Sequence, residues 1–108
     1  MGSKNKISPF GEHIRNLREL KDLTLKNIAE TIKIDVSLLA KIERNERQPT
    51  RQLIKQLAIF FQCDEKELLN NFLSDQIAYK ILDEEADLSI LKVAEEKVKY
   101  LKNGKNEK

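Results

Sequence analysis

The side chains best able to do chemistry in this sequence are its lysines and arginines, and they are unevenly distributed. Residues 1–62 carry twelve Lys or Arg against seven Asp or Glu, whereas residues 63–108 carry eight against eleven. Cationic side chains gathered in one part of a chain attract polyanions such as nucleic acid. The charge pattern therefore favours a nucleic-acid-binding head followed by a tail that has a different use.

Catalytic and metal-binding chemistry find little support in the same sequence. The single histidine, His13, and the single cysteine, Cys63, have no partners at the spacing of a metal site or a nucleophile–base pair. We expect His13 at the surface of a helix, Cys63 as a partly buried small apolar residue, and residues 83–85 as a solvated helix break. The sequence predicts no enzyme, no metal site and no cofactor.

Length and composition indicate one small domain with a short appendage. The chain has 108 residues, of which 40% are hydrophobic and 35% charged, with only three glycines and two prolines. Few breakers and many Leu, Ile, Lys and Glu residues favour an all-α fold. The sequence holds neither an apolar run of membrane-spanning length nor the apolar core of a signal peptide, and its one cysteine favours a reducing compartment. We expect a cytoplasmic protein.

Five short helices are expected before residue 74, each beginning at a residue that commonly caps helix N-termini. The first should cover 9–22, and the third should end near Arg44, where Asn45 tolerates a left-handed backbone. The expected caps are Ser8 (ahead of Pro9), Thr24, Asp35 and Thr50, and Cys63-Asp64 should open the fifth helix. The fifth helix is expected to be short.

The second and third helices carry apolar residues at helical spacing. The inner face that this spacing predicts is Leu25, Ile28, Ala29, Ile32, Leu39 and Ile42. The opposite face of the third helix is Val36, Ser37, Ala40 and Lys41. Two short helices joined by a tight turn, with a proline loop after the second, form a helix-turn-helix unit.

Residues 23–49 resemble the Cro/repressor (XRE) family of transcriptional regulators. The matching features are Leu23-Thr24, Ile28-Ala29-Glu30 and the stretch Ile42-Glu43-Arg44-Asn45-Glu46-Arg47-Gln48-Pro49. The resemblance covers about residues 10–72. It implies a five-helix Cro/repressor-like fold whose third helix lies in the DNA major groove.

The resemblance also implies roles for individual residues. Base-edge contacts would come from Val36, Ser37 and Lys41 on the exposed side of the third helix. Phosphate contacts would come from Thr24, Lys26, Asn45, Arg47 and Arg51. Glu43 would be a structural acid that pairs with Arg15 or Arg18 of the first helix.

Three departures from the family pattern affect these expectations. Leu25 stands where many members have a glutamine that contacts phosphate, and Lys33 stands at the usual turn glycine. A non-glycine residue with positive φ at position 33 costs about 1 kcal/mol. The third helix also carries Asp35 and Leu38, so fewer polar groups face the bases, and DNA shape should contribute more to specificity.

Residues 74–102 are expected to form an interrupted helical extension. Its second part should start near Ala86 or Asp87. It carries a coiled-coil-like stripe spaced three, four and three residues apart, made of Leu91, Ala94, Val98 and Leu101. The stripe could join two copies of the chain or pack against the fifth helix of its own chain. Together the boundaries predict a disordered arm over 1–8, a helix-turn-helix domain over 9–73, the extension over 74–102 and a disordered tail over 103–108.

These observations lead to two functional hypotheses. The first is a sequence-specific regulator that binds an inverted repeat in double-stranded DNA as a homodimer and represses or controls a nearby operon, as in regulators resembling restriction-modification controllers. The alternative is a protein-interaction module of the same fold, such as an antitoxin-type partner of a toxin, which its C-terminal helices would bind. Leu25 and Leu38 favour the alternative, because exposed leucines sit poorly beside phosphates.

Overall fold

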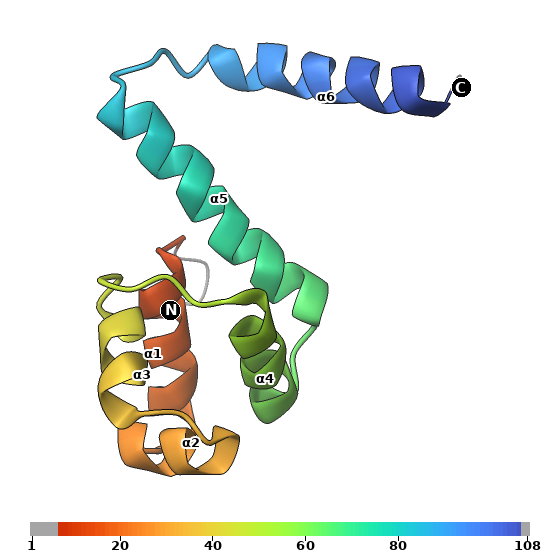
Figure 1. Ribbon diagram of the computed structural model, residues 1–108. Coiled ribbons are helices and arrows are strands. Elements are labelled where there is room, and N and C mark those ends of the chain that lie inside the picture. Colours follow the sequence, from red (N-terminus) through yellow and green to blue (C-terminus); the bar gives the residue numbers. More distant parts are fainter. Residues whose placement is uncertain (1–6, 107–108) are drawn as a thin grey trace. The chain divides into compact units, whose positions relative to one another are not determined.

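The computed structural model describes the backbone of residues 7–106, which contain six α-helices and no strand (Figure 1). The helices are α1 (Phe10–Leu20), α2 (Leu25–Ile32), α3 (Val36–Glu43), α4 (Arg51–Phe61), α5 (Glu65–Asp83) and α6 (Ile90–Asn106). The expected all-α class is confirmed. The expected N-terminal arm falls largely outside the described residues, and residues 7–9 have no regular structure.

Three of the expected caps hold their helices as the sequence predicts. The Thr24 hydroxyl accepts from the Asn27 amide at 3.0 Å, while the Asn27 side chain accepts from the Thr24 amide at 2.9 Å, forming a capping box. Asp35 caps α3 through the Ser37 amide, and Thr50 caps α4 through the Leu53 amide. Local side-chain chemistry therefore sets the starts of α2, α3 and α4.

The first helix begins differently from the expectation. Pro9, with φ −60° and ψ 161°, is the N-cap, and α1 starts at Phe10 and ends at Leu20. Ser8 is therefore not the cap, and the helix is shorter than 9–22. Because no side chain of the cap residue satisfies the first turn, a distant residue does so: the Phe10 amide donates to Asp75 Oδ2 at 2.8 Å.

The C-terminal helices differ most from the expectation. The fifth helix is long and passes through residue 74 without a break, and the Ser74 hydroxyl donates to the Asn71 carbonyl at 2.7 Å. The break after Asp83 is confirmed, with Glu85 at φ 53°. The sixth helix starts at Ile90, later than expected, and continues through Gly104 to Asn106 rather than ending near 102.

The chain divides into two units, residues 1–75 and 76–108. Among the residues whose burial the structure describes, only the first unit has a buried core, to which α1 to α5 all contribute. Phe72 packs against this core through its ring contact with Phe10, with centroids 5.8 Å apart. The buried hydrophobic residues of the first unit are Phe10, Ile14, Ile28, Ala29, Ile32, Leu39, Ile42, Leu53, Ile54, Leu57, Ala58, Phe61 and Leu68. In the second unit, no side chain of residues 76–104 is buried.

Candidate nucleic-acid interface

The turn between α2 and α3 sets the direction of the third helix. Lys33 has φ 62° and ψ 52°, so it adopts the left-handed conformation that the sequence predicts for this position. The Ile34 amide then donates to the Ala29 carbonyl at 3.0 Å, which closes the end of α2. Ala29 is buried, and a larger side chain there would force α2 and α3 apart.

A buried ion pair ties α3 to α1. Arg18 Nε lies 2.8 Å from Glu43 Oε2, and Arg18 Nη2 lies 3.0 Å from Glu43 Oε1, so the guanidinium binds the carboxylate with two parallel hydrogen bonds. Arg18 Nη1 also donates to the Leu23 carbonyl at 3.0 Å. The hydrogen bonds to Glu43 raise the pKa of Arg18. The structural role expected for Glu43 is confirmed, with Arg18 rather than the exposed Arg15 as its partner.

Gly11 of α1 makes a second contact with the C-terminal end of α3, and sequence reasoning missed it. The Gly11 amide donates to Asn45 Oδ1 at 2.9 Å, and a Cβ at residue 11 would lie against the carbonyl oxygens of Ile42 and Glu43. No side chain fits in that space. A glycine in the first turn of a helix, where it weakens the helix, was the available signal. Arg18 and Gly11 together fix α3 against α1 by two separate contacts.

The outward face of α3 presents the three residues expected to read bases. Val36 is 43% exposed, and Ser37 and Lys41 are exposed on the same side of the helix. The Ser37 hydroxyl donates to Asp35 Oδ2 at 3.2 Å, so the cap also orients this side chain. An apolar group, a hydroxyl and an ammonium on one helix face offer a methyl contact and hydrogen bonds to base edges.

The residues expected to contact phosphate lie at helix ends around that face. Thr24 and Lys26 are exposed at the start of α2, and Arg47 and Arg51 are exposed on either side of the α4 cap. The first turns of α2 and α4 add unpaired backbone N–H groups and a partial positive charge. Asn45 is exposed, but its amide oxygen already accepts from Gly11, which leaves its NH2 group for an external acceptor.

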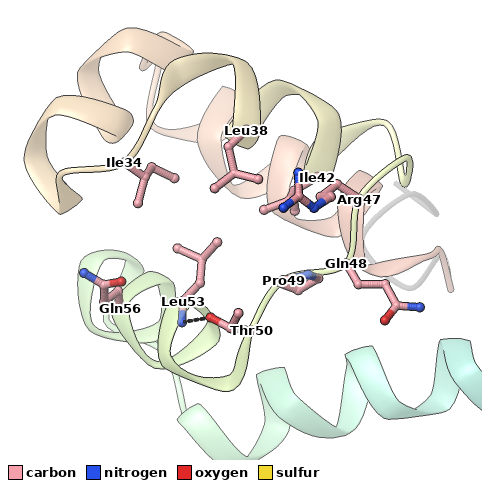
Figure 2. A pocket seen from close by; sticks show the side chains of 9 residues that line it. All are labelled: Ile34, Leu38, Ile42, Arg47, Gln48, Pro49, Thr50, Leu53 and Gln56. Carbon is pink, nitrogen blue, oxygen red and sulfur yellow. Dashed lines mark hydrogen bonds between the residues drawn. The ribbon is translucent and has the colours of Figure 1, made fainter.

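Two leucines that the sequence treats as exposed are half-buried. Leu25 and Leu38 both pack against the core. Figure 2 shows Leu38 pointing across a pocket of about 170 Å³ toward Leu53 of α4. Leu25 thus packs inward, as its helical spacing predicts. The expected exposure of Leu25 and Leu38, which favoured a protein partner as the alternative to DNA, is wrong.

The single histidine and the single cysteine differ in their exposure. His13 is half-buried, and Cys63 is exposed rather than partly buried, following the left-handed Gln62 at the end of α4. The slight burial of the Cys63 thiol raises its pKa. Among residues 7–106, no group of three or more His, Cys, Asp or Glu residues could hold a metal ion. Within the same described range, no helix has the length and apolarity needed to cross a membrane.

The four residues expected at a dimer interface lie in the second unit. Leu91, Ala94, Val98 and Leu101 are all exposed on α6. The structure also exposes apolar residues that the expected stripe does not include, among them Leu82, Leu88 and Val93. The tail therefore carries a larger apolar surface than the sequence pattern alone indicates.

Comparisons with known proteins agree with this geometry. Residues 14–68 match the model of the family described as Helix-turn-helix (HTH_3). The chain is 36% identical over 59 residues to YazB, an uncharacterised HTH-type transcriptional regulator of Bacillus subtilis (strain 168), a match that covers 55% of this chain and 86% of YazB. A chain from a solved SinR protein–SinI protein complex is similar in fold, with a TM-score of 0.52 at 19% identity, over 87% of this chain and 98% of that one.

Proposed function

Because this chain belongs to the helix-turn-helix family of DNA-binding transcription regulators, we propose that it binds one operator sequence in double-stranded DNA as a homodimer and controls a nearby operon. The observation that carries the proposal is the exposed face of α3, held in place by the Arg18–Glu43 pair and the Gly11 contact. The proposal assigns the chain binding rather than catalysis, in the cytoplasm, and no cofactor.

In this proposal the outward face of α3 reads the major groove. Lys41 donates to the O6 and N7 acceptors of a guanine, and Val36 packs on a thymine methyl. Ser37 completes the set with its hydroxyl, whose orientation Asp35 controls. The short α3 offers only these three side chains, so the sequence-dependent shape of the operator supplies further specificity.

Phosphate contacts hold the head in register on the duplex. Thr24 and Lys26 face the backbone on one side of α3, and Arg47 and Arg51 do so on the other. Support comes from their exposure at the starts of α2 and α4, where helix dipoles favour anions. Asn45 contributes through its NH2 group. These contacts add affinity for any sequence and make binding depend on salt.

The homodimer is proposed to form through α6. Leu91, Ala94, Val98 and Leu101 follow heptad-like spacing and are exposed in the single chain, with Leu101 61% exposed. Burying such a stripe against its copy removes apolar area from water. A two-fold dimer would place two α3 helices on an inverted repeat whose half-sites lie about one helical turn apart.

One observation favours a second candidate function, the binding of a protein partner. The end of α5, α6 and the segment between them expose apolar side chains besides the four-residue stripe, including Ile77, Leu82 and Leu88. The SinR chain of similar fold was solved in complex with SinI. A helical partner, such as a toxin in an antitoxin-type pair, could cover this surface while the head still binds DNA.

Selection of binders from a random pool of duplex DNA, at about 0.15 M salt, tests the main proposal. We expect enrichment of an inverted repeat with half-sites about one helical turn apart. Enrichment of a single unrepeated site would contradict the proposal that the chain binds DNA as a homodimer. No enrichment by folded protein would favour the protein-partner function instead.

A further inference from the structure

The reading face of α3 extends by one residue beyond those already considered. Ser37, Lys41 and Arg44 are spaced four and three residues apart, so they line up along one side of a helix. Arg44 is the C-cap of α3, and its side chain is half-exposed. A guanidinium at this position continues the cationic edge that begins at Lys41.

A carboxylate already occupies the fork of this guanidinium. Arg44 Nε lies 3.0 Å from Glu46 Oε2, and Arg44 Nη2 lies 3.1 Å from Glu46 Oε1. Planar guanidinium groups bind phosphate with the same paired geometry that they use for carboxylate. Glu46 therefore presents to Arg44 the kind of anion that a DNA backbone would present.

The backbone holds Glu46 in this place. Asn45 has φ 61°, its amide donates to the Ile42 carbonyl at 3.0 Å, and the Glu46 amide donates to the Lys41 carbonyl at 2.8 Å. These two bonds form the Schellman motif that closes a helix C-terminus. Because the Gly11 amide also donates to Asn45 Oδ1, the backbone before Glu46 is held in place, while the Glu46 side chain is about half exposed.

The Arg44–Glu46 ion pair contributes little to the stability of the fold. Both side chains are about half exposed, and exposed ion pairs contribute little to folding. A carboxylate at a helix C-terminus is also disfavoured by the helix dipole. The hydrogen bonds from Arg44, with a smaller contribution from the charge of Lys41, lower the pKa of Glu46 and keep it ionised.

We propose that Arg44, three residues beyond the base-reading Lys41, forms a binding site for a backbone phosphate of duplex DNA, and that the Glu46 carboxylate occupies this site in the free protein. The site rests on the proposed function. On binding, the phosphate takes the guanidinium fork and the Glu46 side chain turns into solvent. Glu46 thus lowers affinity for every sequence, which shortens the time spent on nonspecific DNA.

Fluorescence anisotropy with one selected operator and one unrelated duplex tests the site. Glu46→Gln should raise the affinity for both duplexes about three- to tenfold at low salt, and the gain should shrink as salt screens the charges. Arg44→Gln should weaken both. In the Arg44→Gln background, Glu46→Gln should have almost no effect, because the two residues act on one phosphate.

A matched control removes the effect of net charge. Glu84→Gln also takes the acid from an exposed ion pair, with Lys80 at 3.5 Å, and changes net charge by the same amount. It should leave DNA affinity within about twofold of wild type. Circular dichroism should show equal melting for all variants, since each altered side chain is exposed.

Three outcomes would overturn the site. An unchanged or lower affinity for Glu46→Gln would show that Glu46 does not compete with DNA. A gain that persists without Arg44 would mean that Glu46 only repels the duplex at a distance. Saturable binding of inorganic phosphate alone to Glu46→Gln, seen in the Arg44 Nε–H NMR signal at millimolar concentration, would assign the site to a free anion. If wild type binds the operator and Glu46→Gln gains nothing, the proposed function stands while this site fails.

Discussion

The two units of the chain differ in what happens to their apolar side chains. The first unit buries thirteen hydrophobic residues around α1 to α5, caps its helices with side chains and ties α3 to α1 by an ion pair. The second unit buries none of its side chains within residues 76–104. A unit that buries its own core can fold as a single chain. Covering an exposed apolar helix, by contrast, removes apolar surface from water and lowers the free energy. This difference supports the proposal that the first unit binds DNA and that α6 of the second unit associates with another helix.

The largest expected effect tests whether the core belongs to the head alone. Leu57 is fully buried, and Leu57→Ala should lower the free energy of unfolding by about 4 kcal/mol, because it leaves a cavity in a packed core. Leu101→Ala, in the tail, should change it by less than about 0.5 kcal/mol at low protein concentration. Urea unfolding measures both. An equal cost for Leu101→Ala at every dilution would contradict the division between head and tail.

The second effect tests what holds α3. Arg18→Met keeps the aliphatic contacts but leaves the Glu43 carboxylate, which is 3% exposed, without its cation. We expect a loss of about 3 kcal/mol of stability, since an unpaired buried charge is costly. Arg44→Met is the control, because it breaks an exposed pair and should cost less than about 1 kcal/mol. Equal costs in urea unfolding would mean that the Arg18–Glu43 pair does not fix the helix.

A third effect tests the tail as the dimer surface. Leu91→Glu combined with Val98→Glu places two charges in the proposed stripe, so the chain should become monomeric and bind its operator at least about tenfold more weakly. Lys92→Glu is the control on the same helix, since residue 92 lies outside the stripe and is exposed. Sedimentation equilibrium gives the mass. An unchanged dimer dissociation constant in the double variant would show that α6 does not form the interface.

The smallest effect concerns the helix ends. Lys33, with φ 62°, carries the strain that a glycine would avoid, so Lys33→Gly should raise stability by about 1 kcal/mol. Lys55→Gly, within α4, should lower stability by about the same amount. Thermal melting separates the two directions. A loss of stability in Lys33→Gly would show that the lysine side chain holds the turn.

Local chemistry explains which parts of this fold the sequence predicts. Thr24, Asp35 and Thr50 act on amides two or three residues away, so their roles follow from short stretches of sequence. The break after Asp83 can also be predicted from a short stretch of sequence, because the acidic residues 83–85 interrupt the apolar stripe. The length of α5 was missed although residues 65–83 contain no glycine or proline that would end a helix at residue 74.

Contacts between distant residues explain most of what the sequence did not predict. Asp75 satisfies the Phe10 amide from 65 positions away, and Gly11 meets Asn45 from 34 positions away. Neither pair has a signature in spacing. The half-burial of Leu38 likewise depends on α4, which lies across a pocket from it. The site residues Ser37 and Lys41 could be placed on an outward helix face from periodicity, while their roles toward DNA stay predictions.

The central claim is that two copies of α3 read DNA through the face that carries Lys41. Parallel selections from one random duplex pool, with wild type and with Lys41→Ala, test it most directly. We expect both proteins to enrich the same inverted repeat, with Lys41→Ala losing its preference at one symmetric pair of positions and about 1–3 kcal/mol of affinity. An unchanged preference at every position, or a preference lost in only one half of the repeat, would contradict the account.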